Sequence, residues 1–157
     1  MASRGPHRRI AQEIKKIKSL ESDEYFAELV NDNDMYNLKG YVNGPKDTAY
    51  EGQKYKLHIQ LPPDYPIKPF KVKFTTKIYH PNVGGSGVIC LDILQGKWTP
   101  AENIISVLKS IQLLMANPNP DSPLNGKAAR EYKNNMEIYK ENVIKTYSSN
   151  KSSNKPE

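Results

Sequence analysis

The sequence has little of what would indicate a disulfide-bonded, metal-binding or membrane protein. Its single cysteine, Cys90, can form no disulfide within the chain, which favours a reducing compartment, the cytosol or the nucleus. One cysteine and three scattered histidines lack the spacing of metal ligands, so we expect no metal. The longest apolar runs are too short to cross a bilayer and the polar N-terminus predicts no signal peptide, so we expect no membrane partner.

Positive charge is in excess but is nowhere concentrated. The formal net charge is +6, which suits an acidic partner. No run of five or more Lys or Arg residues exists, and no basic stripe is interleaved with aromatic residues as in nucleic-acid-binding modules. We therefore expect no nucleic-acid partner, and a nucleic-acid-binding module is an alternative that rests on net charge alone.

The apolar pattern changes period along the chain, and this change predicts the fold. Residues 7–20 carry isoleucines at helical spacing, and residues 101–115 carry a second such stripe. Between them, the segment 54–61 alternates apolar residues with lysine, histidine and glutamine, which predicts an antiparallel strand with one wet face. Shorter patterns of the same kind predict three more strands, at 25–30, 36–42 and 70–75.

The end of the chain predicts two further helices and a tail. The helices fit 124–132 and 135–147, whereas the Ser/Asn/Lys composition of 148–157 indicates a polar disordered tail. With the strands consecutive and the helices at the two ends, the expected fold class is α+β: one helix, a four-stranded antiparallel meander, then helices. A length of 157 residues suits one such domain, over 1–147.

The segment 78–100 has no periodicity, and long structured loops of this kind are usually functional. Cys90 lies in it, after the glycine-rich stretch 84–87. A lone cysteine is more often a buried small side chain than a nucleophile, but a thiol on such a loop can meet a bulky reactant. Nothing around the histidines resembles a cysteine-protease signature.

Several motifs from residue 79 onward occur in a fixed order. They are Tyr79-His80-Pro81-Asn82, Cys90-Leu91-Asp92-Ile93-Leu94 and Trp98-Thr99-Pro100-Ala101. Together they resemble the catalytic core of the ubiquitin-conjugating enzyme family. The resemblance extends from residue 7 to about 147 and includes Tyr50-Glu51-Gly52, Leu61-Pro62, Asp64-Tyr65-Pro66 and the stretch Pro118-Asn119-Pro120-Asp121-Ser122-Pro123-Leu124. The family fold agrees with the predicted order of elements.

The resemblance implies a role for each residue of the core. Cys90 would accept ubiquitin from an activating enzyme as a thioester and pass it to a substrate lysine. Asn82 would stabilise the oxyanion that forms when the amine attacks, or would only hold its loop. His80 is expected to brace the loop rather than to act as a base. Ser122 stands where many members carry Asp, so it would orient the amine without being a strong base, whereas Asp92 would either contact the acceptor or be a plain surface carboxylate.

The resemblance also implies partner surfaces. The basic end of the first helix would bind the activating enzyme, and the residues that match in type are Arg8, Arg9, Lys15 and Lys16. Ligases, with the RING type favoured, would bind two proline-rich loops at Ile67, Lys68, Pro100 and Ala101. The gaps around Cys90 show no insertion of the kind carried by SUMO-specific relatives, which favours ubiquitin. No cofactor is expected, because the activating enzyme consumes the ATP.

One further alternative is a protein that has the same fold but does not catalyse the reaction. A non-enzymatic relative would bind ubiquitin or a conjugating partner without forming a thioester. Such relatives typically lack the cysteine, so Cys90 argues against this interpretation.

Overall fold

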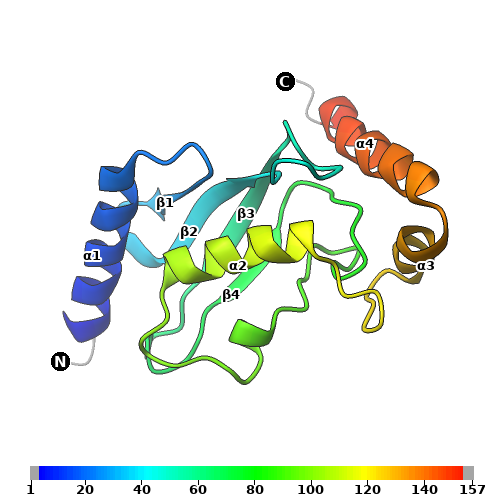
Figure 1. Cartoon of the computed structure of the whole chain (residues 1–157). Helices are drawn as coiled ribbons and strands as arrows, with labels where there is room; N and C mark the ends of the chain where they lie inside the picture. The colour runs from blue at the N-terminus through cyan, green and yellow to red at the C-terminus, as the bar shows by residue number, and fades with distance from the viewer. Residues whose placement is uncertain (1–3, 154–157) are drawn as a thin grey trace.

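The computed structural model describes residues 4–153. Its elements follow the order α1 (Arg4–Leu20), β1 (Tyr25–Asn31), β2 (Asp34–Asn43), β3 (Lys54–Gln60), β4 (Lys71–Phe74), η1 (Asp92–Leu94), α2 (Ile104–Ala116), α3 (Gly126–Asn134) and α4 (Met136–Ser153) (Figure 1). The four strands form one antiparallel meander in the order β1-β2-β3-β4. The predicted α+β class and order of elements are therefore confirmed. No helix within 4–153 is long and apolar enough to cross a membrane.

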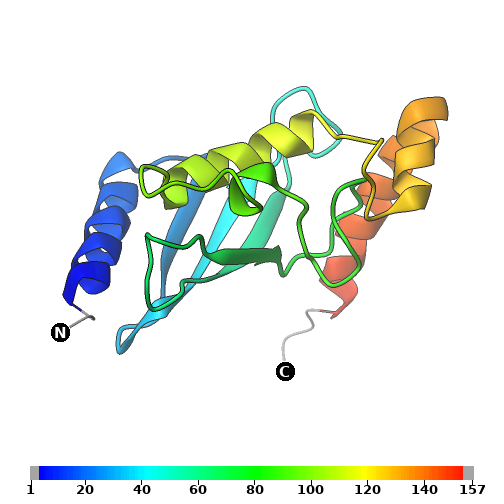
Figure 2. The ribbon, with the colours of Figure 1, turned by 90° about the horizontal axis from the view of Figure 1, so that it is seen from below.

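The core lies between the sheet and α2, which crosses one face of the strands (Figure 2). On β3 the alternation seen in the sequence is the alternation of burial: Tyr55, Leu57 and Ile59 are buried, whereas of the residues between them Lys56 is exposed and His58 is half-buried. The face of α2 that meets them carries Ile104, Leu108 and Ile111, all fully buried. One face of the sheet is thus sealed by a helix, and the other is open to water.

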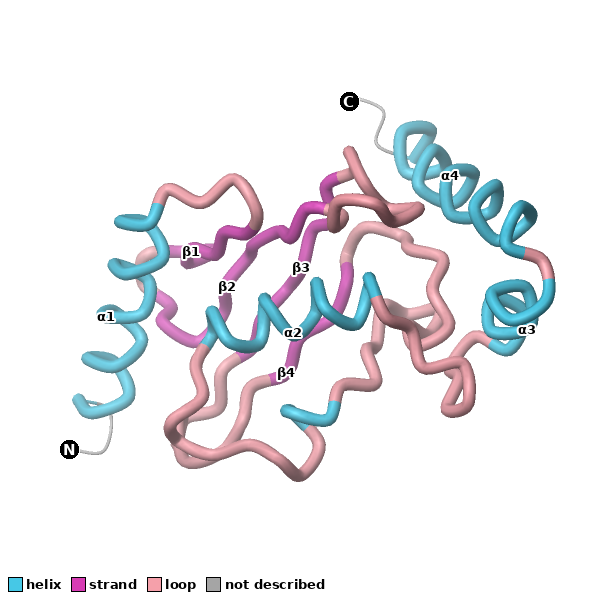
Figure 3. Tube along the Cα trace, viewed as in Figure 1, coloured by secondary structure: helices cyan, strands magenta, loops and turns pink. Residues whose placement is uncertain are grey.

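Helix α1 packs at the β1 edge of the domain, at the opposite end from α3 and α4 (Figure 1). It buries Ile10, Ile14 and Ile17, the stripe that predicted it. Between β4 and α2 the chain is almost entirely loop, interrupted only by the short helix η1 (Figure 3). This loop contains Cys90 and corresponds to the segment that showed no periodicity.

Helix α2 begins at Ile104, three residues later than the pattern predicted. The reason is a capping box: the Asn103 side chain accepts from the Ser106 N–H, and the Ser106 hydroxyl accepts from the Asn103 N–H. Residues 99–102 form a turn ahead of this cap, in which the Glu102 N–H donates to the Thr99 carbonyl.

The prediction that 148–157 is a disordered tail is wrong for 148–153, because α4 continues to Ser153. Tertiary contacts explain the extension. The Tyr147 ring lies 5.1 Å from the Tyr55 ring, and the Asn150 side chain hydrogen-bonds both the N–H and the carbonyl of Lys77, at 2.9 and 3.1 Å. Packing against the strands overrides a composition that alone favours disorder. Residues 154–157 lie outside the described part of the chain.

Candidate active site

A tight hairpin places Cys90. Val83 and Ile89 pair across it, and the Gly84 N–H donates to the Val88 carbonyl at 2.9 Å. Gly87 has a φ of +90°, and a Cβ there would lie 2.0 Å from the Phe74 carbonyl oxygen, so only glycine fits this close approach to β4. The glycine-rich stretch is therefore the turn that returns the chain toward residue 82.

The Cys90 thiol is partly exposed at the wall of a cavity of about 640 Å³. Its own N–H donates to the Asn82 carbonyl at 3.1 Å, which fixes the two residues side by side. Its Sγ lies 3.7 Å from Gln95 Oε1. Besides Cys90, the cavity is lined by Asn82, Leu91, Asp92, Ile93, Lys97, Glu102, Ser110, Leu113, Leu114, Asn117, Asn119 and Ser122.

His80 is fully buried behind this wall and braces it. Its Nδ1 accepts from the Asn82 N–H at 2.9 Å, so the proton sits on Nε2, which donates to the Leu114 carbonyl at 2.9 Å. Burial lowers the pKa of His80 to about 4, because the charged ring would lose its hydration. His80 is therefore neutral at physiological pH with both nitrogens occupied, and it cannot take a proton from a reacting amine in this arrangement.

The Asn82 carboxamide is committed to the loop 119–122. Its Nδ2 donates to the carbonyls of Asn119 and Ser122, at 2.8 and 3.1 Å, and its Oδ1 accepts from the Asn119 N–H at 2.8 Å. Only 1% of the residue is exposed. Of the two roles that the sequence left open, this geometry is that of a brace. To donate to an oxyanion, the amide would first have to release one of these carbonyls.

The loop 119–125 is also hydrogen-bonded to Pro81, the residue before Asn82. The N–H groups of Leu124 and Asn125 both donate to the Pro81 carbonyl, at 2.8 and 3.0 Å. Ser122 is exposed and lines the same cavity as Cys90. Asp121 beside it forms an ion pair with Lys133 of α3 at 2.8 Å. The negative charge nearest Ser122 in sequence is thus already paired.

Asp92 opens the helix η1 two residues after Cys90 and also lines the cavity. Its side chain is 81% exposed, and Oδ2 lies 3.8 Å from Lys97 Nζ. Four of the five residues predicted for the reaction, Cys90, Asn82, Asp92 and Ser122, therefore share one cavity, with His80 buried beneath it.

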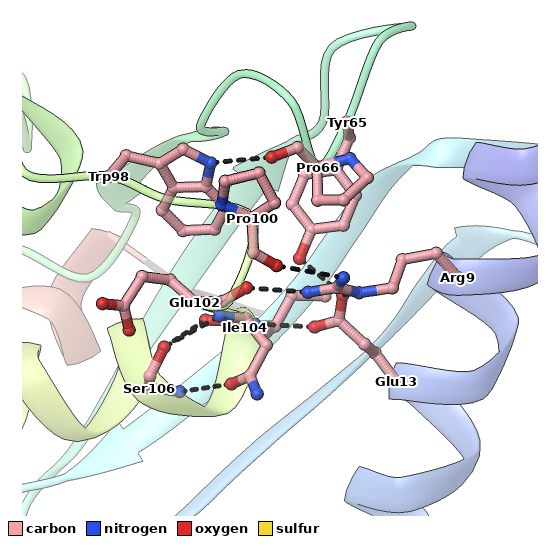
Figure 4. Close-up of polar contacts among 10 residues, drawn as sticks. Arg9, Glu13, Tyr65, Pro66, Trp98, Pro100, Glu102, Ile104 and Ser106 are labelled. Carbon is pink, nitrogen blue, oxygen red and sulfur yellow. Dashed lines mark hydrogen bonds and ion pairs between the residues drawn. The ribbon is translucent and has the colours of Figure 1, made fainter.

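The predicted partner residues fall into two groups. Arg8, Lys15 and Lys16 are exposed on α1, as are Ile67, Lys68, Pro100 and Ala101 on the two loops. Arg9, predicted together with them, is partly buried and is bonded within the chain. Its guanidinium donates to Glu13 and to the carbonyls of Pro100 and Glu102, at 2.8, 3.2 and 2.7 Å (Figure 4).

Sequence reasoning missed several residues of the cavity. Leu113, 64% exposed, and Leu114 form an apolar wall from α2. Gln95, which is not part of the cavity lining, approaches the thiol. Leu113 lies outside the buried stripe of α2, and an apolar residue off that stripe is the one signal that could have indicated it. Within residues 4–153, no three His, Cys, Asp or Glu side chains gather as a metal site would require.

The chain begins with one helix, continues with a meander backed by α2, and carries its thiol on the loop between β4 and α2. Known proteins share this combination. A family model described as "Ubiquitin-conjugating enzyme" matches residues 9–147. The E2 domain of a Toxoplasma gondii ubiquitin-conjugating enzyme superposes with a TM-score of 0.84 at 36% identity, over 92% of this chain and 97% of that one. A putative ubiquitin-conjugating enzyme from Plasmodium yoelii gives 0.84 at 37% identity, over 90% and 92%.

The match spans most of the chain, so the chain belongs to the ubiquitin-conjugating enzyme family and is an enzyme of that type. The resemblance noted in the sequence is confirmed. Membership implies, in general terms, ubiquitin, an activating enzyme and a ligase as partners.

Proposed function

We propose that this enzyme carries ubiquitin as a thioester on Cys90 and transfers it to a lysine of a protein substrate, usually with a ligase. One observation carries the proposal: the only thiol of the chain is partly exposed at a cavity that also contains the Asn82, Asp92 and Ser122 side chains. A sealed thiol could not meet the end of another protein.

The reaction consists of two acyl transfers. The Cys90 sulfur attacks the thioester carbonyl held by the activating enzyme, a C–S bond forms, and the activating enzyme's thiol leaves. A lysine amine then attacks the same carbonyl, a C–N bond forms, and the Cys90 thiol is released as the amine loses a proton. The first exchange is nearly isoenergetic, so we propose that no cofactor takes part here and that ATP is consumed by the activating enzyme alone.

The two sides of the cavity suit the two reactants. The apolar wall of Leu91, Ile93, Leu113 and Leu114 can cover an extended C-terminal segment of the modifier. We propose that the lysine amine arrives beside the loop at Ser122, which lines the same cavity. Its serine hydroxyl can accept a hydrogen bond from the amine but is a poor base, so we propose that Ser122 and Asp92 orient the lysine rather than deprotonate it.

Partner docking follows the exposed residues. We propose that Arg8 and Lys15 on α1 meet an acidic surface of the activating enzyme, and that a RING-type ligase covers Ile67, Lys68, Pro100 and Ala101. Ile67 is 69% exposed, and such an apolar anchor is the kind of residue that a ligase pocket would bury. Because the thiol must remain reduced to react, we place the enzyme in the cytoplasm, the nucleus or both.

A single gel tests the proposal. The protein is mixed with activating enzyme, ATP and ubiquitin and run without reductant, beside Cys90→Ala and Cys90→Ser variants. We expect a shifted band that reductant removes in the wild type, a reductant-resistant ester band for Cys90→Ser, and no band for Cys90→Ala.

Two results would replace the proposal. Retained ubiquitin binding without any covalent band would indicate a non-enzymatic relative. Oligonucleotide binding that weakens steeply with salt, again without a band, would indicate a nucleic-acid-binding module.

A further inference from the structure

A single carboxylate joins three separate parts of the chain. Glu13 lies on the inner side of α1, where its side chain is 11% exposed. Its Oε2 accepts from the Tyr65 hydroxyl at 2.5 Å and from Arg9 Nε at 2.8 Å (Figure 4). Its Oε1 accepts from the Ile104 N–H, the first residue of α2, at 2.7 Å. All three donors converge on the two oxygens of one largely buried carboxylate.

Arg9, one turn earlier on α1, extends the same cluster. Nε is bonded to Glu13, and the two terminal nitrogens donate to the main-chain oxygens of Pro100 and Glu102. The guanidinium also lies 5.7 Å from the centre of the Tyr65 ring. A planar group with several fixed donors can hold two loop carbonyls at once, which a lysine ammonium on a flexible stem does less well.

The two loops attached to this cluster are also attached to each other. The Trp98 indole N–H donates to the Pro66 carbonyl at 2.9 Å, and the Trp98 ring lies 6.0 Å from the Tyr65 ring. Burial and the hydrogen bond to Glu13 both raise the pKa of Tyr65, so its hydroxyl remains a donor at physiological pH. Loop 62–68 and loop 97–102 thus form one assembly, fixed to α1 through Glu13 and Arg9.

The exposed sides of these two loops carry Ile67, Lys68, Pro100 and Ala101. A surface made of two loops binds tightly only if the loops are already in place, because ordering them at the moment of binding costs free energy. The cavity at Cys90 is lined by residues between Asn82 and Ser122, to which Glu13 and Tyr65 do not belong. Glu102, whose carbonyl Arg9 holds, does line the cavity, so the separation applies to Glu13 and Tyr65: these two side chains are placed to affect ligase docking without touching the reacting atoms.

We propose that Glu13, together with Arg9, is a positioning residue for ligase binding: it holds the two exposed loops at a fixed spacing so that a ligase meets them as one preorganised surface. The inference rests on the proposed function, because it assigns these loops to the ligase. It predicts a defect confined to the ligase-dependent step, whereas a purely structural carboxylate would affect charging, lysine discharge and ligase stimulation in the same proportion.

The test uses Glu13→Gln, with Glu141→Gln on the exposed side of α4 as the matched control. Gln keeps the size of the side chain but replaces one acceptor oxygen by a donor, so it cannot accept all three bonds. Three rates are measured: charging by the activating enzyme, discharge of the isolated thioester to free lysine, and discharge stimulated by a RING domain. The RING probe is the member of a purified panel that stimulates the wild type most.

We expect Glu13→Gln to charge and to discharge to free lysine within about twofold of the wild type. The RING concentration for half-maximal stimulation should rise at least about fivefold, with the maximal rate unchanged, because preorganisation affects binding and not the bound complex. Tyr65→Phe removes one donor from the loop side and should give the same pattern. The two changes together should cost less than the sum of each alone, since they break one interaction.

Three outcomes overturn the inference. The first is an unchanged RING dependence in both variants. The second is a loss shared equally by charging, lysine discharge and stimulation. The third is a wild type that charges normally but responds to no RING domain in the panel. A wild type that forms no thioester at all is the separate failure of the proposed function. If Glu13→Gln does not fold, Tyr65→Phe decides the question by the same measurements.

Discussion

Replacing Asn82 by alanine separates the two roles that its carboxamide could have. The side chain makes three hydrogen bonds to the loop at Asn119 and Ser122, and it is almost completely buried. At about 1 kcal/mol for each bond, Asn82→Ala should lower the free energy of unfolding by about 3 kcal/mol. For a domain of this size that corresponds to a fall in Tm of about 6–12 °C.

The assay is urea unfolding followed by fluorescence of the single tryptophan, Trp98, with thioester discharge to free lysine measured on the same samples. Asn117→Ala is the matched control, because the Asn117 carboxamide is exposed and makes a single local bond to the Leu113 carbonyl. We expect the control to cost about 0.5 kcal/mol or less, as surface substitutions usually do.

One result would refute the reasoning. Losing an oxyanion donor typically slows an acyl transfer about 100- to 1000-fold. If Asn82→Ala slowed discharge by that factor while its unfolding curve matched that of the wild type, the three bonds to the loop would contribute nothing to the free energy of unfolding. The amide would then have to act in the reaction itself.

Other predictions concern the hairpin, the buried histidine and the acceptor side. Gly87→Ala should cost at least about 2 kcal/mol in urea unfolding, because its Cβ would meet the Phe74 carbonyl, whereas Gly85→Ala, with open space around it, should be nearly neutral. The pKa of His80 is about 4 in the folded chain and about 6.5 in the unfolded chain, so between these pH values only the unfolded chain binds a proton at this residue. The free energy of unfolding should therefore fall by about 3 kcal/mol as the pH is lowered from 6.5 to 4. A His80→Gln variant should lack this part of the pH dependence in the same unfolding assay, and an identical pH profile for both proteins would count against it. Ser122→Asp should speed discharge to free lysine about fivefold, through about 1 kcal/mol of attraction for the positive charge that develops on the attacking amine, and equal single-turnover rates would exclude an electrostatic role at this position.

The fold could be predicted wherever buried residues recur at a regular spacing along one helix or strand. The isoleucines of α1 and the alternation of β3 are one-face patterns that reflect a single buried side, so they are visible in the sequence. The end of α4 could not be predicted in this way. Its Ser/Asn/Lys residues carry no apolar stripe, and Asn150, bonded to Lys77 from 73 positions away, attaches the helix to the loop that follows β4.

The candidate site shows the same division. Residue identity and order were enough to indicate Cys90, Asn82, Asp92 and Ser122, which line one cavity. The state of each group could not be obtained from the sequence. The residue type of Arg9 placed it among the partner-binding residues, but one of its bonds is to a main-chain oxygen 91 residues later, and no side-chain pattern encodes a carbonyl. For Asn82 the choice between roles likewise depended on which carbonyls its amide meets.

The way in which the loop 119–125 is attached has a consequence for how members of this architecture can diverge. On the loop side, every bond to Pro81 and Asn82 described above is made by the main chain: the oxygens of Asn119 and Ser122 and the N–H groups of Asn119, Leu124 and Asn125. The Ser122 side chain contributes to none of these bonds. Under the proposed role of Ser122 in orienting the acceptor, a single substitution at this position would change acceptor preference, since a new side chain inherits a backbone already anchored to Pro81 and Asn82.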